Sequence, residues 1–250
     1  MSKKILVCAT NYGVWAEELQ APWDALTDAG HELTIATYKG IKPLPLQISV
    51  DPEFMDPMQN YQVNPPEVCE RTKALVQSDA WDNPVKFKDA NMADYDAIVM
   101  AGGLGAMLDM GNNQALHRLI LAALEQGKLV ASICYANAVL VFTRDPKNGY
   151  KSVIHGKKIA AHCRAWDFDV DFTYDLWGAT EGNKGTDLVS PGFLFPLQDL
   201  VTDAVGPEGE CVYDETANRE KPVVAYDAPF LTGLSVESSI AFGRKLVEVL

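Results

Sequence analysis

Short runs of consecutive apolar residues alternate along the chain with segments in which apolar residues recur every three or four positions. Such runs are typical of strands buried on both faces of a sheet, and the wider spacing is typical of helices that cover one. Because strands alternating with helices form βαβ units, the sequence predicts an α/β fold with a mostly parallel sheet. The expected strands are residues 5–9, 31–37, 95–101, 128–133, 158–162, 201–204, 223–225 and 230–232, and the expected helices are residues 15–29, 67–78, 113–126, 136–142 and 236–250.

Two segments break this alternation. Residues 40–66 contain six prolines, which predict a long surface insertion after the second strand, placed to shape the entrance of a pocket. Residues 164–192 are expected to be rich in loops. Neither segment resembles a low-complexity linker, and the length of 250 residues suits one large α/β domain over residues 1–250.

The charge of the chain narrows the classes of partner. It carries 34 acidic and 21 basic residues, a formal net charge of -13, which opposes binding to nucleic acid or to anionic lipid. No apolar run approaches the roughly 18 to 20 residues that a membrane span needs. A small neutral or cationic substrate, or a protein partner, suits this chain better.

The cysteines indicate a reducing compartment. There are five, spread along the chain without a CxxC pair or a zinc-finger spacing. An odd number of scattered cysteines is typical of free thiols in the cytoplasm. The sequence therefore predicts a cytoplasmic protein with neither a disulfide framework nor a structural metal site.

Cys134 is the first candidate for a reactive residue. It follows the expected strand Leu-Val-Ala-Ser-Ile directly and precedes a helix, so it lies at the carboxyl edge of the sheet, where open α/β sheets bind ligands. The N-terminus of the helix would stabilise a thiolate there. A small buried side chain is the alternative, as for most free cysteines.

Two further segments end near the same edge. Glycines in Ala-Gly-Gly-Leu-Gly-Ala, residues 101–106, would let backbone amides approach an oxyanion, or would serve only a tight turn. Glu17 and Glu18 begin the first helix, where the helix dipole alone accounts for at least one of them. A carboxyl group brought against a thiolate would have a raised pKa and would act as a proton donor or shuttle.

Taken together, these segments identify a family. The chain resembles the ThiJ/PfpI superfamily, which is related to class I glutamine amidotransferases, and most closely its stress-chaperone and glyoxalase-III-like branch. The resemblance runs nearly end to end. It rests on Glu18-x-x-x-Pro22, the glycines at 101–106, the segment around Cys134, Ile-His-Gly-Lys-Lys at 154–158 and Leu-Thr-Gly-Leu-Ser at 231–235.

The resemblance implies a flavodoxin-like three-layer sandwich, often dimeric, that acts without a cofactor. It places Cys134 at the nucleophile position and Glu18 at that of a protonated acid, with backbone amides near Gly103 and at Tyr135 as an oxyanion pocket. The sequence departs from the glyoxalase-like pattern at two positions, where Tyr135 and Leu104 replace histidines. Loss of the histidine after the cysteine puts the proton transfer of a glyoxalase III reaction in question.

Residues at the end of the expected strand 158–162 and just after it offer a substitute for the missing histidine and a second candidate nucleophile. His162 would project into the same edge and could replace the missing histidine, or could be satisfied within a loop. Cys163 is a competing nucleophile, and Trp166 a candidate substrate contact. Asp167, Asp169 and Asp171 alternate like part of a calcium loop but lack its glycine and its closing glutamate, so no metal is expected. The aromatic cluster Trp166, Phe168, Phe172, Tyr174 and Trp177 is expected to form a pocket wall, a dimer contact or ordinary core.

The sequence therefore predicts a cysteine-nucleophile enzyme for a small electrophilic carbon substrate, acting as a hydrolase, a hydratase or a glyoxalase-III-like lyase. The alternative is a protein without catalysis, either a stress-response holding chaperone or a cysteine redox sensor. A binding module that only captures a ligand is a third possibility.

Overall fold

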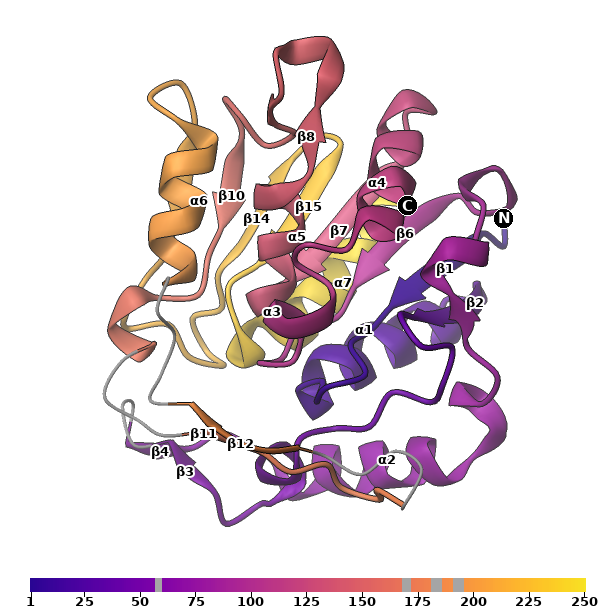
Figure 1. Cartoon of the computed structure of the whole chain (residues 1–250). Helices are drawn as coiled ribbons and strands as arrows, with labels where there is room; N and C mark the ends of the chain where they lie inside the picture. Colours follow the sequence, from indigo (N-terminus) through magenta and orange to yellow (C-terminus); the bar gives the residue numbers. More distant parts are fainter. Residues whose placement is uncertain (57–59, 168–171, 181–185, 191–195) are drawn as a thin grey trace.

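The central sheet contains seven strands, in the order β14-β15-β7-β6-β1-β2-β5. All neighbours pair in parallel except β14 and β15, which are antiparallel. The computed structural model describes residues 1–56, 60–167, 172–180, 186–190 and 196–250, and only the backbone of 172–174 and 186–190 (Figure 1). The strands are β1 (Lys4–Cys8), β2 (Glu32–Thr37), β5 (Val85–Lys86), β6 (Ala97–Met100), β7 (Leu129–Ile133), β14 (Val224–Asp227) and β15 (Phe230–Gly233).

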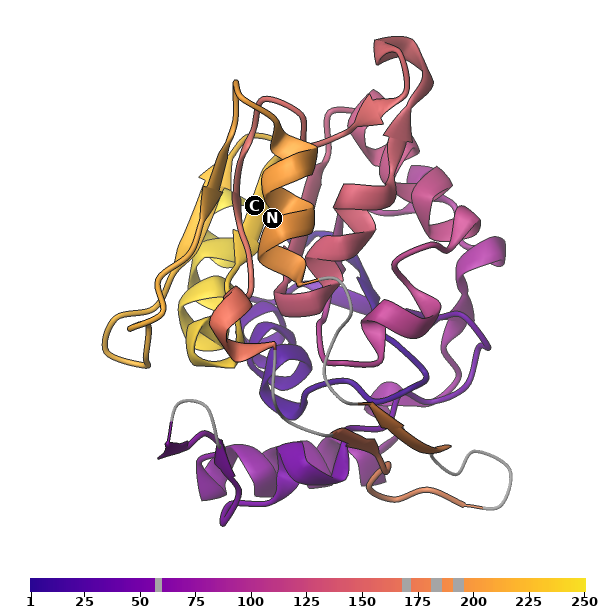
Figure 2. The same cartoon turned by 60° about the vertical axis from the view of Figure 1, so that its left-hand side comes forward.

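Helices cover both faces of this sheet, which gives the flavodoxin-like three-layer arrangement that the resemblance implied. Helices α1 and α7 pack together on one face, with α2 beside α1, and the remaining helices lie on the other face (Figures 1 and 2). The helices are α1 (Ala16–Asp28), α2 (Pro66–Gln77), α3 (Ala106–Asp109), α4 (Gln114–Glu125), α5 (Asn137–Phe142), α6 (Leu197–Val205) and α7 (Ser239–Val249).

The central strands explain why the sequence selects this fold. Ile5 to Cys8 and Ala97 to Met100 are at most 1% exposed, as expected for strands covered by helices on both faces. These two apolar runs therefore lie in the middle of the sheet, where helices cover both faces. Apart from one strand, the strands and helices expected from the apolar pattern are confirmed, with shifts of one to three residues at their ends.

One expected strand is wrong. Residues 201–204 lie inside helix α6 (Leu197–Val205), not in a strand. Leu197, Val201, Ala204 and Val205 are buried and spaced four, three and one residues apart, which is one face of a helix. The prediction failed because residues 201–204 alone, without Leu197 and Val205 on either side, do not show the helical spacing.

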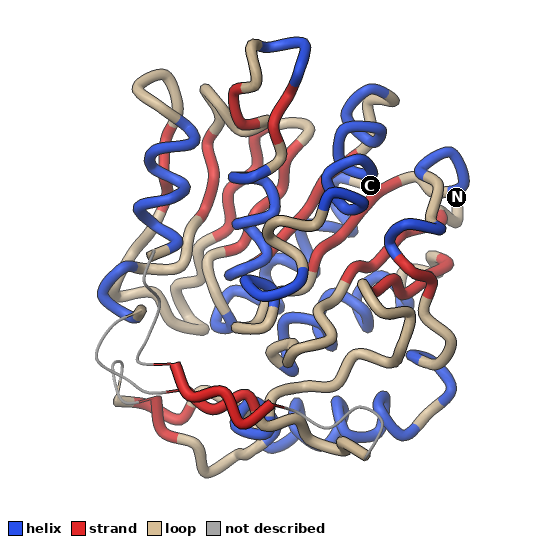
Figure 3. Tube along the Cα trace, in the orientation of Figure 1, coloured by secondary structure: helices blue, strands red, loops and turns tan. Residues whose placement is uncertain are grey.

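Shorter strand pairs lie outside the main sheet (Figure 3). Strand β10 (Lys158–Ala160) pairs with β13 (Glu210–Val212), and β8 (Arg144–Asp145) with β9 (Lys151–Ser152). The insertion contains β3 (Met55–Asp56) and β4 (Tyr61–Gln62), and β11 (Phe172–Tyr174) pairs with β12 (Thr186–Ser190). Together with α2, these last two pairs lie beyond the carboxyl edge of the main sheet (Figures 1 and 2).

None of the helices in the described ranges is both long enough and apolar enough to cross a membrane.

Candidate active site

Cys134 lies at a sharp turn between β7 and α5, as the sequence predicted. Its φ angle is 55°, in the left-handed region that residues with a side chain rarely adopt. The turn continues as a short 3-10 helix, Cys134–Ala136, into α5. This conformation is typical of nucleophiles at strand-to-helix turns, where backbone strain presents the side chain to a ligand.

Asn137 holds this turn in place. Its side-chain amide donates hydrogen bonds to the carbonyl oxygens of Ala160, at 2.8 Å, and Gly233, at 3.1 Å, while its carbonyl oxygen accepts one from the Ser132 hydroxyl. The side chain is fully buried. The start of α5 is thereby tied to both β10 and β15, a contact network that the sequence did not predict.

Glu18 reaches the thiol from the first turn of α1. Glu18 is 1% exposed, and its carboxyl group interacts with the Cys134 thiol and with the backbone N–H of Gly103. Both side chains press against Gly102, where an added Cβ would lie 2.4 Å from Glu18 Oε2 and 2.8 Å from Cys134 Cβ. Gly102 is therefore needed for close contact between carboxyl and thiol, a role more specific than the tight turn that its sequence suggested.

Burial sets the protonation of this pair. It raises the pKa of the Glu18 carboxyl well above its usual range, and the charges of Glu237 and Glu17 add to the effect. Burial also raises the pKa of the Cys134 thiol, as does the neighbouring Glu18, whereas Ser235 and the N–H of Tyr135 lower it. Because two negative charges in this dry space are unfavourable, the pair loses its two protons in separate steps and holds one between them over a range of pH.

A small cavity opens in front of Cys134. It has a volume of ≈ 50 Å³ and is lined by Trp15, Glu18, Phe54, Asp56, Val63, Gly103, Leu104, Cys134, Tyr135, His162, Trp166, Ser235 and Val236. All seven site residues predicted from the sequence are among these. Phe54, Asp56 and Val63 come from the proline-rich insertion, which therefore shapes the pocket as expected.

The two backbone amides expected to bind an oxyanion interact with the Glu18 and Cys134 side chains. Gly103 lines the cavity, but its N–H is directed at the Glu18 carboxyl, and the N–H of Tyr135 is directed at the Cys134 sulfur. Both amides therefore stabilise negative charge on the pair itself. Ser235 lies on the other side, with its hydroxyl oxygen 3.8 Å from the sulfur.

His162 lies in the cavity wall, next to the residue that replaces the expected histidine. Its ring stacks on Tyr135 with centroids 4.7 Å apart, and Trp166 meets its other side at 5.4 Å. Nδ1 lies 2.9 Å from Asp167 Oδ1, which also accepts a hydrogen bond from the Tyr135 hydroxyl. His162, Tyr135 and Asp167 therefore form one buried polar group beside Cys134.

Asp167 determines the charge state of this group. Burial lowers the pKa of the His162 imidazole, but the charge and hydrogen bond of Asp167, together with the charges of Glu237 and Asp56, outweigh burial, so that the pKa lies above its ordinary value. Asp167 is fully buried and its second oxygen accepts the N–H of Leu197 at 3.2 Å. The sequence pointed to Asp167 only as one of several acidic residues in an aromatic loop, without singling it out.

The other residues of that loop for which the sequence predicted a role lie partly inside and partly outside the described part of the chain. Cys163 is fully buried and does not line the cavity, and burial raises the pKa of its thiol to about 12, so it is a poor nucleophile. Asp169, Asp171 and Phe168 lie outside the described residues, as do the side chains of Phe172 and Tyr174. Trp166 lines the cavity and Trp177 packs against the core.

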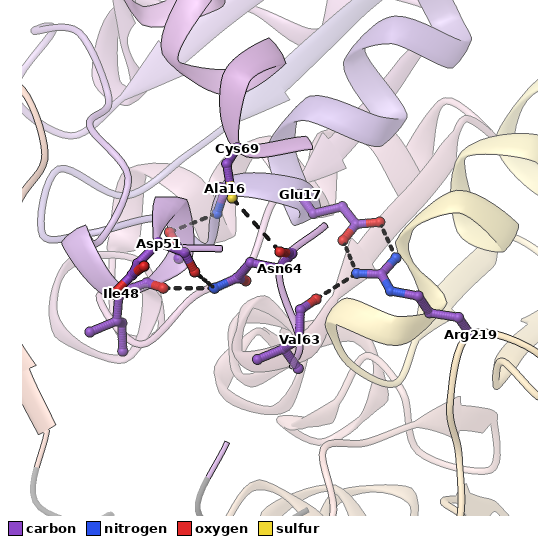
Figure 4. Close-up of polar contacts among 9 residues, drawn as sticks. Ala16, Glu17, Ile48, Asp51, Val63, Asn64, Cys69 and Arg219 are labelled. Atoms are coloured by element: carbon purple, nitrogen blue, oxygen red, sulfur yellow. Dashed lines mark hydrogen bonds and ion pairs between the residues drawn. The ribbon is translucent and has the colours of Figure 1, made fainter. Parts of the chain in front are cut away.

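Glu17 has a separate, structural role. Its buried carboxylate receives two hydrogen bonds from the Arg219 guanidinium, one of them 2.6 Å long, and Arg219 also donates to the carbonyl of Val63 at 2.7 Å (Figure 4). Asn64, next in the chain, donates to the carbonyls of Ile48 and Asp51. This clamp joins the helix that carries Glu18 to the insertion that forms the outer cavity wall.

Comparison with known proteins gives this site a family context. Residues 9–161 match the profile of a family described as ThiJ/PfpI family-like. A glutathione-independent glyoxalase of Schizosaccharomyces pombe is 24% identical over 163 residues, which are 60% of this chain and 59% of that protein. The match thus spans under two thirds of that curated relative.

Solved structures agree over nearly the full length. The Rapid Encystment Protein of Francisella tularensis has a TM-score of 0.73 and 20% identity, covering 98% of both chains. Glyoxalase III of Candida albicans has a TM-score of 0.71 and 19% identity, covering 99% of this chain and 97% of its own. Such identities establish a shared fold, and the profile match covers more than half of the chain. The chain belongs to the ThiJ/PfpI-like family.

Proposed function

We propose that this protein is an enzyme in which Cys134 bonds covalently to the carbonyl carbon of a small aldehyde, and that its reaction is of the glyoxalase type. The observation that carries the proposal is the contact between the strained Cys134 and the buried Glu18 carboxyl at the floor of a cavity. A carboxyl group with a raised pKa can take the thiol proton and return it to the substrate near neutral pH. The glyoxalases among its relatives support the same reaction class.

The first step is addition of the sulfur to the aldehyde carbon of a 2-oxoaldehyde. The C–S bond forms while the carbonyl π electrons move to oxygen, which takes the proton held by Glu18 and Cys134. The product is a hemithioacetal. No redox partner is needed, because the next step is an internal rearrangement.

His162 then supplies the base that Tyr135 cannot. It removes the proton from the carbon bonded to sulfur, and the resulting enediol regains a proton at the neighbouring carbon, which gives a thioester of a 2-hydroxy acid. Water cleaves the thioester and restores the thiol. The sum is the addition of one water to a 2-oxoaldehyde. Asp167 and Tyr135 hold the imidazole in position.

Turnover of 2-oxoaldehydes tests this proposal. We expect the wild-type protein to convert such a substrate to its 2-hydroxy acid, measured by proton NMR. Because the base form of His162 is required and its pKa lies above 6.5, kcat/KM should rise with pH through the neutral range. His162→Gln should lower kcat by about 100-fold or more and remove that dependence.

Two results would contradict parts of the proposal. If no 2-oxoaldehyde, simple aldehyde or activated ester forms a Cys134 adduct detectable by mass spectrometry, the covalent mechanism is wrong. If turnover occurs and His162→Gln leaves both kcat and its pH profile unchanged, another residue is the base. An Asp167→Asn variant, which keeps one oxygen acceptor, should shift the profile to lower pH because it loses the charge beside His162.

A further inference from the structure

A second cavity opens at the carboxyl edge of the sheet. It has a volume of ≈ 660 Å³, which lies in the range of sites that hold whole small molecules. Its walls include Tyr12, Tyr38, Leu108, Asp109, Asn112 and Gln114. None of the described residues that line it also lines the Cys134 cavity, so the proposed reaction does not use this space.

The second cavity lies where the order of the strands reverses. The chain runs from β1 outward to β2 and β5, then returns to β6 on the other side of β1 and continues to β7. Tyr12 comes from the loop after β1, and Tyr38 directly follows β2. Helix α3, which follows β6, supplies Leu108 and Asp109. In open α/β sheets, the loops at such a reversal separate and leave a crevice for a ligand.

Apolar side chains from separate loops form part of its wall. Tyr38 is 54% and Leu108 is 40% exposed, and large apolar side chains grouped at the surface mark binding sites. Lys39 covers one face of Tyr12, with Nζ 4.5 Å from the ring centroid, so Tyr38 is the more open ring. Aromatic side chains stack on the flat π systems of ligands, which favours a ligand with a planar ring.

Asp109 supplies a buried acceptor to the same cavity. The residue is only 6% exposed, and its Oδ2 accepts the N–H of Asn11 at 2.9 Å, whereas Oδ1 makes no hydrogen bond of ordinary geometry. Burial raises its pKa to about 6 against the opposing effects of Asn11, Thr10 and Lys39. At pH 7.5 the group is therefore mainly a carboxylate, which only accepts hydrogen bonds and favours a ligand with an N–H or O–H donor.

The start of α4 is not available to a phosphate group. Asn113 Oδ1 already accepts the N–H groups of Ala115, at 3.1 Å, and Leu116, at 3.2 Å, which an anion at a helix N-terminus would use. No lysine or arginine is among the described residues that line the cavity, and the carboxylate of Asp109 repels anions. These features favour an uncharged ligand.

We infer that this second cavity binds a neutral nucleoside, with the base stacked on Tyr38 and an N–H of the base donated to Asp109. A nucleoside combines a flat ring, N–H donors at the ring edge and no net charge. The exposed amides of Asn112 and Gln114 line the same cavity and can pair with ring nitrogens or ribose hydroxyls. The inference does not rest on the reaction proposed for Cys134.

Three matched probes test the class of ligand. N6,N6-dimethyladenosine keeps the ring and the ribose of adenosine but has no N–H donor on the base, and adenosine 5′-monophosphate adds negative charge. Saturation-transfer difference NMR detects binding to the wild-type protein at pH 7.5, and titration gives each Kd. We expect adenosine to bind, and both other probes to bind at least about fivefold more weakly.

Variants locate the site. Tyr38→Ala should weaken adenosine binding at least about fivefold. Tyr213→Ala is the matched control, because Tyr213 is 46% exposed and does not line the cavity, and its Kd should stay within twofold of the wild type. Asp109→Asn keeps an acceptor for Asn11 and should reduce the preference for adenosine over its dimethyl analogue.

Four results would overturn the inference. They are no saturation transfer from adenosine, equal Kd values for adenosine and its dimethyl analogue, tighter binding of the monophosphate, and unchanged adenosine binding by Tyr38→Ala. Each leaves the covalent mechanism at Cys134 intact, because turnover there is measured separately. Binding of glucose in the absence of adenosine binding would equally overturn it, since the site would then select a sugar.

Discussion

Replacing Cys134 by serine should lower kcat/KM by at least about 1,000-fold. Serine keeps the size and the left-handed turn, but its hydroxyl ionises far less readily than a thiol, so the proton transfer to Glu18 that precedes attack becomes unfavourable. The measurement is turnover of a 2-oxoaldehyde together with circular dichroism, which should show an unchanged fold. The effect isolates the nucleophile because the substitution changes one atom.

Cys211→Ser is the matched control for this variant. Cys211 lies in β13, away from the cavity, and its thiol donates to the carbonyl of Gln198. A serine hydroxyl can make the same hydrogen bond, so turnover should stay within twofold of the wild type. Turnover by Cys134→Ser within tenfold of the wild type would show that the sulfur is not the attacking atom.

Replacing Arg219 by alanine should lower the free energy of unfolding by about 3 kcal/mol. Removing one partner of a buried ion pair leaves the other charge uncompensated, and such changes typically cost 3 to 5 kcal/mol. The carboxylate of Glu17 is only 2% exposed, whereas the Arg219 side chain is 27% exposed, which favours the lower end of that range. Urea denaturation at neutral pH measures the loss.

Two further variants separate the stability contributed by the ion pair from the general effect of a lysine- or arginine-to-alanine substitution. The double variant Glu17→Gln with Arg219→Ala should recover at least half of the lost stability, because it removes the unpaired charge. Lys245→Ala, which breaks an exposed pair with Glu248, should cost less than about 0.5 kcal/mol. A loss below 1 kcal/mol for Arg219→Ala would contradict the stabilising role of this ion pair.

Most of the sheet could be predicted from the sequence because the apolar run that marks each buried strand is a local pattern. Buried parallel strands require continuous apolar runs, and each run at β1, β6 and β7 sits between helices with clear apolar faces. The position of Cys134 followed from the same reasoning, since the residue after a buried strand reaches the carboxyl edge. Helix α6 was missed because it is only nine residues long and its buried residues extend to both sides of the expected strand.

Contacts between segments that are far apart in the sequence could not be predicted from local apolar patterns. Arg219 and Glu17 are 202 residues apart, and no local pattern marks them as partners. The grouping of Tyr135, His162 and Asp167 depends on β10 lying beside β15 and on the turn that follows β10. The sequence placed His162 at the right edge, but its stacking on Tyr135 required the structure.

The central claim is that Cys134 and Glu18 share one proton, and the pH dependence of iodoacetamide alkylation tests it most directly. With each cysteine followed by mass spectrometry, the alkylation rate of wild-type Cys134 should rise with pH in two steps, with a plateau between the two ionisations of the pair. In Glu18→Gln the carboxylate that raises the thiol pKa is absent, so Cys134 should react faster than in the wild type once the pH exceeds the first ionisation of the pair, and its rate should rise with pH as a single ionisation. Equal Cys134 alkylation rates in the two proteins across the pH range would contradict the shared proton.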